Sequence, residues 1–193
     1  MDAARRELVD QLYRDSREHD AAREDRLARF RNVEPESAAL LAVLIRATGA
    51  RRLLEIGTSN GYSTIWLADA AEATGGELIS FEVDPARTEL ARENLARAGL
   101  EADLRTQDVG EALPEWTDGA WDFVFLDAER PAYVDYWPEL VRTLAPSGLL
   151  VVDNVLSHED QLVEFTTLVE ADDRVTTTIV PIGAGLRLAV REP

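Results

Sequence analysis

From Arg51 onward the sequence alternates between short apolar runs and amphipathic stretches, and this alternation constrains the fold more than any other feature. The predicted strands are RRLLEIG, ELISFEV, EADLRTQ, WDFVFLD and SGLLVVD, and a stretch with helical periodicity follows each of them. Apolar runs of about four to eight residues between amphipathic helices are typical of parallel strands that are buried on both faces. The repeated strand–helix order therefore predicts an α/β fold, in which a doubly wound, mostly parallel sheet carries helices on both sides.

The two ends of the chain differ from this pattern. Residues 1–31 contain eight Arg and eight Asp or Glu among sparse apolar residues such as Leu12 and Leu27. A thin apolar stripe of this kind predicts a helical arm that packs on the domain surface or on a partner subunit. Residues 36–48 predict a buried helix, and VTTTIVPIGAGLRLAVRE predicts two closing strands that supply an antiparallel edge strand. We thus expect a helical arm over residues 1–31 and one domain over residues 32–193.

The net charge and the missing residue types exclude several functions. The chain carries 20 basic and 37 acidic residues, for a net charge of −17, which disfavours nucleic acid and anionic membrane surfaces as partners. It has no Cys, which excludes disulfides and Cys-based metal sites, and no Lys, which excludes Schiff-base chemistry. We see no secretory leader and no apolar run of about 18 residues, so we expect a cytoplasmic protein.

Acidic residues stand where the predicted strands end. In chain order they are Glu55, Glu82, Asp108, Asp127 and Asp153, the last of them followed by Asn154. Any one of them can simply be the N-cap of the next helix. The carboxyl ends of parallel strands meet at one edge of the sheet, however, and ligands bind in the crevice there. We therefore expect these side chains to converge on one crevice.

The turn after the first predicted strand, GTSNG, narrows the choice of ligand. Gly57 and Gly61 allow a tight turn at the start of a helix, but the G-x-G-x-x-G spacing of dinucleotide binders is missing. Glu55 would repel a pyrophosphate and suits a positive group such as an amino-acid ammonium. Glu82 is placed to accept hydrogen bonds from ribose hydroxyls. This combination describes S-adenosylmethionine better than NAD.

Four segments carry a family resemblance. LLEIGTSNGYST, SFEVDPAR, WDFVFLDAERPAY and LLVVDNVL, in that order, resemble the cation-dependent class I O-methyltransferases, which include the catechol and caffeoyl-CoA O-methyltransferases. The similarity runs from about Asn32 to the C-terminus. It implies a seven-stranded, Rossmann-like methyltransferase sheet with an antiparallel last strand. Together with the amphipathic arm, it also suggests a homodimer.

The resemblance implies a set of residues that bind S-adenosylmethionine. They are Val33, Glu55, Gly57, Thr58, Ser63, Glu82, Asp108 and Asp127. The chain departs from the family at Gln107, where a Gly usually precedes the acidic residue beside the adenine. Asp108 can alternatively be a helix cap, and Val33 can be a core residue.

The resemblance also implies that Asp127, Asp153 and Asn154 bind a metal ion. These side chains offer only oxygen donors, which select Mg²⁺, Mn²⁺ or Ca²⁺ over zinc. A phenol has a pKa of about 10, as Tyr does, and a bound divalent cation would lower it. We therefore expect both hydroxyls of a small dihydroxy aromatic acceptor to bind the cation, and one of them to attack the methyl group.

One departure affects the mechanism. The family commonly places Lys three residues after the first metal aspartate, as a general base, and here that residue is Arg130. Arg130 can hardly accept a proton, although it can stabilise a phenolate or hold an acidic substrate. His158 is a possible base or an exposed residue in the first turn of a helix. Our candidate catalytic residues are thus Asp127, Arg130 and His158.

Two other functions stay open at this point. An NAD-dependent oxidoreductase shares the fold and the ribose-binding acid, but it is disfavoured by Glu55 and by the missing glycine motif. A relative that binds the cofactor without transferring a methyl group is suggested by Arg130. Four aromatic residues are candidates for stacking on the acceptor or for core packing, namely Trp116, Tyr133, Tyr136 and Trp137.

Overall fold

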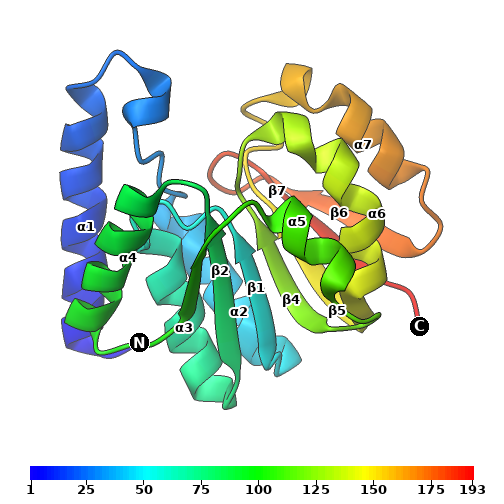
Figure 1. The fold of residues 1–193 in the computed structure, drawn as a ribbon, viewed down its shortest axis with the longest axis horizontal. Coiled ribbons are helices and arrows are strands. Elements are labelled where there is room, and N and C mark those ends of the chain that lie inside the picture. Colours follow the sequence, from blue (N-terminus) through cyan, green and yellow to red (C-terminus); the bar gives the residue numbers. More distant parts are fainter.

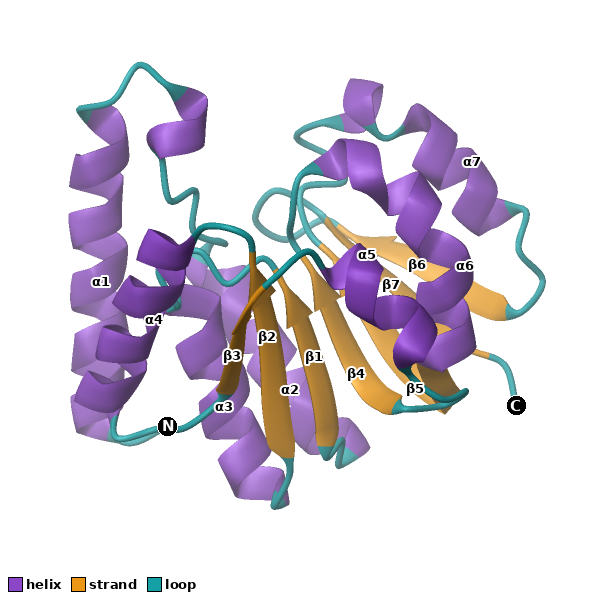
Figure 2. Ribbon diagram, in the orientation of Figure 1, coloured by secondary structure: helices purple, strands orange, loops and turns teal.

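A seven-stranded sheet runs through the centre of the molecule, with helices on both faces (Figures 1 and 2). The computed structural model describes all residues, 1–193. The strands are β1 (Arg52–Ile56), β2 (Glu77–Glu82), β3 (Asp103–Thr106), β4 (Trp121–Leu126), β5 (Leu144–Val152), β6 (Val175–Val180) and β7 (Leu186–Arg191). Their order across the sheet is β3-β2-β1-β4-β5-β7-β6. The chain therefore starts near the middle of the sheet and winds outward in both directions, which confirms the doubly wound fold.

The strand directions confirm the predicted mostly parallel sheet with an antiparallel last strand, β7. The neighbouring pairs among β1 to β5 are parallel, and β7 runs antiparallel to both β5 and β6. The antiparallel strand thus lies inside the sheet, whereas we expected it at the edge. β6 is the edge strand instead, because the closing hairpin folds back so that β7 pairs with the buried β5.

The helices divide into two layers. They are α1 (Ala3–Ala21), α2 (Pro35–Thr48), α3 (Tyr62–Thr74), α4 (Pro85–Ala98), α5 (Val109–Ala112), α6 (Tyr133–Thr143) and α7 (Val163–Glu170). Short 3₁₀ turns occur at η1 (Arg26–Ala28), η2 (Leu113–Glu115), η3 (Arg130–Ala132) and η4 (Glu159–Gln161). The first four α-helices cover one face and the last three cover the other (Figure 1). None of these helices has the length and apolarity needed to cross a membrane.

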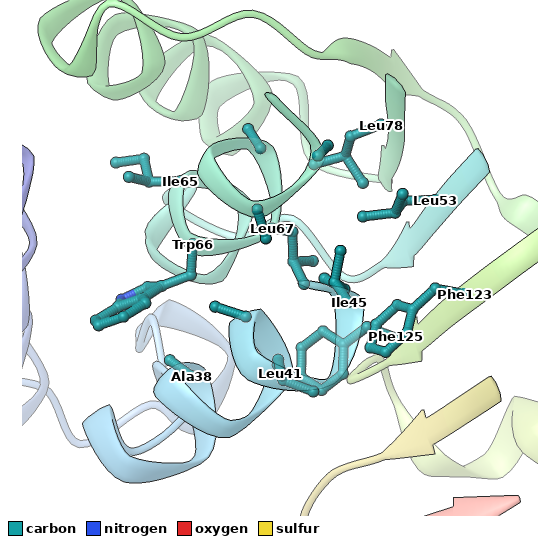
Figure 3. Packing of buried hydrophobic residues seen from close by; sticks show 14 of the residues in the cluster. Ala38, Leu41, Ile45, Leu53, Ile65, Trp66, Leu67, Leu78, Phe123 and Phe125 are labelled. Carbon is teal, nitrogen blue, oxygen red and sulfur yellow. The ribbon is translucent and has the colours of Figure 1, made fainter. Parts of the chain in front are cut away.

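Each face of the sheet has its own hydrophobic core. Successive strand residues point to opposite faces, so Leu53 packs in the core under α3 and Leu54 in the core under α6, and both are fully buried. Figure 3 shows the first core, in which Leu41 and Ile45 of α2 pack near Phe125 of β4. Burial on both faces explains why the strands read as continuous apolar runs.

The N-terminal arm packs on the domain. α1 contacts α3 and α4, and its Val9 and Leu12 are buried in the same core as α2. The expected apolar stripe is only partly used, since Leu27 is 66% exposed. The Ser16 hydroxyl accepts hydrogen bonds from the amides of Asn32 (2.9 Å) and Asn60 (2.8 Å), and so ties α1 to the turn after β1. The division into an arm and a domain stays a prediction.

We predict that Ser16→Ala destabilises the protein by about 1–3 kcal/mol, because two amide groups lose their acceptor and Ser16 is only 3% exposed. Thermal unfolding should shift downward by several degrees. Thr167→Ala removes an exposed hydroxyl on α7 and serves as the matched control. Equal unfolding temperatures for Ser16→Ala and the control would mean that this network does not fix the arm.

Candidate functional site at the carboxyl ends of the strands

A cleft of about 690 Å³ opens at the carboxyl ends of the strands. Residues of the arm, of the turn after β1 and of the segments after β2, β3, β4 and β5 line it. Ten of the predicted site residues lie on its surface: Val33, Gly57, Thr58, Ser63, Glu82, Asp108, Asp127, Arg130, Asn154 and His158. Glu55 and Asp153 are buried and do not line it. The expected convergence on one crevice therefore holds for most of the set.

Gly57 is required by the packing of the backbone after β1 against the backbone after β4. Its φ is +108°, and a Cβ atom at this position would lie 2.1 Å from the carbonyl oxygen of Asp127. The backbone N–H groups of Gly57 and Thr58 both donate to the carbonyl of Phe81, at 2.9 and 3.1 Å. The turn is thus fixed between β2 and β4, and it brings Asp127 next to the glycine.

Glu55 has a fully buried carboxylate and does not line the cleft. The hydroxyls of Ser63, Thr64 and Ser80 donate to it, each at 2.6 Å. Burial raises the pKa of Glu55 to about 7, although these hydrogen bonds oppose the shift. Glu55 therefore holds Ser63, which does line the cleft, and the structure shows no direct path from Glu55 to a ligand's ammonium group.

Glu82 lies at the end of β2 and is 8% exposed. One carboxylate oxygen accepts a hydrogen bond from the Ser59 N–H at 2.8 Å, and the other accepts from the N–H groups of Val83 (2.9 Å) and Asp84 (3.0 Å). Two carboxylate oxygens offer about four acceptor sites, so capacity remains for a ligand hydroxyl. The backbone bonds hold the carboxylate in place for such a contact.

Asp108 serves as a cap and also lines the cleft. Its side chain accepts hydrogen bonds from the Gly110 N–H and from the Tyr136 hydroxyl, both at 2.7 Å. Val33 is a core residue, 3% exposed, and it also lines the cleft. A place in the cleft is therefore compatible with the capping role of Asp108 and with the core packing of Val33.

Of the four candidate stacking residues, Tyr136 alone lines the cleft. Tyr133 and Trp137 are fully buried and pack edge-on against Phe165 of α7. Trp116 packs edge-on against Trp121, with ring centroids 4.8 Å apart. These three aromatic residues belong to the packing of the second helix layer.

Asp127, Asp153 and Asn154 come together at the ends of β4 and β5. The Asn154 amide nitrogen donates to Asp127 Oδ1 at 3.1 Å and to Asp153 Oδ2 at 3.0 Å, so it bridges the two carboxylates. The backbone of Asn154 is left-handed, with φ +66°. This conformation turns its side chain back toward the carboxylates.

The two carboxylates lack a full counter-charge. Burial raises the pKa of Asp127, opposed by the charges of Arg31 and Arg130. Burial and the nearby charge of Asp127 raise the pKa of Asp153. In addition, Asp153 Oδ1 is buried without a hydrogen-bond partner.

A hard divalent cation fits this donor set. No place in the chain gathers three or more His, Asp or Glu side chains that suit a metal, so the candidate consists of two carboxylates and one amide. The Asn154 amide hydrogens already occupy the position between the carboxylates where a positive charge is favoured.

Arg130 and His158 flank this cluster on the cleft wall. Arg130 is 7% exposed and donates to Gln161 at 3.2 Å, and its Nε has no partner. His158 lies directly before the 3₁₀ turn η4 and outside the first turn of α7, which begins at Val163. Its Nδ1 lies 2.8 Å from the Ser157 hydroxyl. Burial and the charge of Arg130 lower the pKa of His158, which favours the neutral imidazole.

The arm contributes to the cleft through residues that the sequence did not single out, among them Phe30 and Arg31. The segment between α1 and α2 lies across the cleft, where the Ser59 hydroxyl donates to the Phe30 carbonyl at 3.0 Å. Arg31 donates to Glu129, next to the predicted metal site, at 2.6 Å. The signal available in the sequence was the dense run of Arg in RLARFRN directly before Val33.

The sequence is similar to those of known O-methyltransferases. The sequence matches the model of the O-methyltransferase family over residues 6–192. A catechol O-methyltransferase of Niastella koreensis is 36% identical over 141 residues, and the alignment covers 70% of this chain and 63% of that protein. The chain thus spans less than two thirds of that relative's length.

Two solved structures are similar over almost the whole chain. An O-methyltransferase from Bacillus cereus, in complex with SAH, has a TM-score of 0.80 at 25% identity and covers 96% of this chain and 91% of its own. The O-methyltransferase TomG from Streptomyces achromogenes, in complex with SAM, has a TM-score of 0.77 at 28% identity. The match covers 100% of this chain and 91% of the TomG chain.

The buried Glu55 predicts a pH dependence of stability. Its pKa is raised to about 7 in the folded protein, so its favourable contribution is complete below about pH 4.5 and is lost as the pH rises through 7. Glu55→Gln keeps the shape and removes the titration. The free energy of unfolding of the wild type should therefore fall by about 3 kcal/mol relative to Glu55→Gln between pH 4.5 and pH 7. Parallel curves from urea unfolding at each pH would contradict this assignment.

Proposed function

The chain belongs to the O-methyltransferase family, and we propose that it transfers the methyl group of S-adenosylmethionine to a hydroxyl of a small catechol-like aromatic acceptor, assisted by a divalent cation. The observation that carries this proposal is the meeting of Asp127, Asp153 and Asn154 beside the Gly57 turn. The cleft can thus receive a cofactor and a hard cation side by side. The catechol O-methyltransferase among its relatives supports the acceptor class.

The cofactor half of the cleft suits S-adenosylmethionine, which supplies the methyl group as a sulfonium. Ser63, held by Glu55, can bind the amino-acid end, and Gly57 and Thr58 border the same place. Glu82 can bind the ribose hydroxyls. In this arrangement the backbone turn lets the cofactor approach the sheet edge closely. The assignments of Val33 and Asp108 to the methionine and adenine ends stay predictions.

The acceptor half has the donors that a cation such as Mg²⁺ requires. Asp127 and Asp153 would supply carboxylate oxygens, and Asn154 would supply its amide oxygen once the amide group turns over. A bound divalent cation lowers the pKa of a phenol and orients two vicinal hydroxyls. The unpartnered Asp153 oxygen and the raised pKa values of both carboxylates support this site, because both are what two buried acids show without a cation.

The chain's own residues divide the remaining tasks. Arg130 stays protonated, so it can stabilise negative charge on the acceptor oxygen and cannot take its proton. His158 is neutral near pH 7 because its pKa is lowered, and it can receive a proton directly or through water. The arm forms one side of the cleft.

An NAD-dependent oxidoreductase is the weaker alternative. The family match and the SAH- and SAM-bound structures of relatives favour a sulfonium cofactor, and the turn after β1 lacks the dinucleotide motif. A relative that binds the cofactor without turnover differs from our proposal only in activity. The expected homodimer stays a prediction. Sedimentation analysis would measure the oligomeric state.

The deciding experiment is a methylation screen over catechols, flavonoids and acyl-CoA phenols, with S-adenosylmethionine, in the presence of Mg²⁺ or of EDTA. We expect methylation of a catechol that EDTA abolishes and Mg²⁺ restores. Asp153→Asn should lower kcat by more than about 100-fold, because it removes a charged ligand of the cation. Asp118→Asn removes an exposed carboxylate far from the cleft and is the control. Full activity in EDTA would refute cation assistance.

We also predict that His158→Ala retains activity within about tenfold of the wild type, because a cation held by Asp127, Asp153 and Asn154 would already lower the pKa of the phenol. Steady-state kcat with a catechol acceptor measures this. A thousandfold loss would instead make His158 the essential base.

A further inference from the structure

Positive charge gathers at the acceptor end of the cleft, in a chain whose net charge is −17. Arg26, Arg31 and Arg130 all line the cleft, and all three act on His158 through their charges. Two of them come from the arm and one from the segment after β4. We call these three side chains the arginine cluster. The charges of Arg31 and Arg130 also act on the carboxylate of Asp127, a candidate ligand of the cation.

The arginine cluster is incompletely paired. Glu129 accepts from Arg31 at 2.6 Å and lies 3.9 Å from Arg26, so one carboxylate serves two guanidinium groups. Arg130 has the neutral amide of Gln161 as its hydrogen-bond partner. The Nε–H groups of Arg31 and Arg130 are buried without any acceptor. These two Nε–H groups have no solvent contact, so a ligand in the cleft would bind through the other N–H groups of the two side chains.

The backbone fixes Arg31 over the cleft at a cost. Its φ is +54°, a left-handed conformation that residues other than Gly, Asn and Asp rarely adopt. The Asp20 carboxylate holds this conformation by accepting from the N–H groups of Phe30 (2.7 Å) and Arg31 (2.9 Å). Strain that the surrounding structure maintains in this way is typical of ligand-binding positions.

We propose that the arginine cluster binds a carboxylate on the methyl acceptor, so that the substrate is a catechol carboxylic acid, such as a dihydroxybenzoate, in preference to a neutral or cationic catechol. This inference rests on the proposed function. Guanidinium groups pair with carboxylates through two parallel hydrogen bonds, and Arg31 and Arg130 both line the cleft. One phenolate oxygen, held at the cation, cannot satisfy both Arg31 and Arg130.

The carboxylate of S-adenosylmethionine is a second group that the arginine cluster could bind. Arg31 stands two residues before Val33, which also lines the cofactor side of the cleft. The two sources predict different results, because only the first makes affinity depend on the acceptor's charge. The test therefore measures acceptor and cofactor binding separately.

The experiment compares 3,4-dihydroxybenzoate with its methyl ester, which has the same catechol and no charge. In the wild type we expect kcat/KM for the acid to exceed that for the ester at least tenfold. Arg31→Gln should lower the ratio of kcat/KM for the acid to kcat/KM for the ester about tenfold. Arg26→Gln, at an exposed position of η1, should lower kcat/KM for the acid by a smaller factor. This second variant keeps the test valid if Arg31→Gln fails to fold. Arg92→Gln on α4, outside the cleft, is the matched control for charge.

A second readout needs no turnover. Calorimetry should give about tenfold weaker binding of dihydroxybenzoate to Arg31→Gln, with S-adenosylhomocysteine present, and unchanged affinity for S-adenosylhomocysteine. Weaker S-adenosylhomocysteine binding with an unchanged acid-to-ester ratio would assign Arg31 to the cofactor and overturn the inference.

The remaining outcomes separate the inference from the proposed function. Methylation of acid and ester at equal kcat/KM would overturn the inference and leave the proposed function standing. Arg31-dependent binding of the acid without methylation of any catechol would support the inference and refute the proposed function.

Discussion

The site depends on hydrogen bonds that continue the sheet one residue beyond the strand ends. The Asp127 N–H donates to the Ile56 carbonyl at 2.9 Å, and the Asp153 N–H donates to the Leu126 carbonyl at 3.2 Å. These bonds set the carboxylates of β4 and β5 side by side and bring Gly57 against the Asp127 backbone. A shift of either strand by one residue would turn its acid to the opposite face of the sheet. The two hydrophobic cores therefore serve the site by fixing the register of β1, β4 and β5.

Placing acids at this edge has a cost that the structure offsets in two different ways. Glu55 is fully buried, and three hydroxyl donors satisfy its carboxylate, so it is a closed structural element behind Ser63. Asp127 and Asp153 share one amide, and an oxygen of Asp153 has no partner. The first arrangement is complete within the chain, whereas the second leaves one carboxylate oxygen without a donor. This contrast distinguishes the supporting acid from the candidate metal ligands.

The sequence was sufficient for the fold because periodicity and strand-end acids are local signals. Alternating apolar runs identified the strands, and the acids after β4 and β5 identified the candidate metal site. The burial of Glu55 was not predictable, since it depends on hydroxyls from two other elements, α3 and β2. The role of Arg31 was also missed, because its contact with Glu129 joins residues 98 positions apart. The order of β7 and β6 depends on how the last hairpin folds back, which the strand pattern leaves open.

We propose that Asp127, Asp153 and Asn154 hold one divalent cation beside the cofactor. Crystals grown with Mn²⁺ and S-adenosylhomocysteine would locate the ion, because Mn²⁺ gives an anomalous signal. We expect a single peak within coordination distance of oxygens from all three side chains, with the Asn154 amide turned so that its oxygen faces the ion. An Mn²⁺-free cluster that keeps the amide nitrogen between the two carboxylates, at Mn²⁺ concentrations that support turnover, would rule out this cation site.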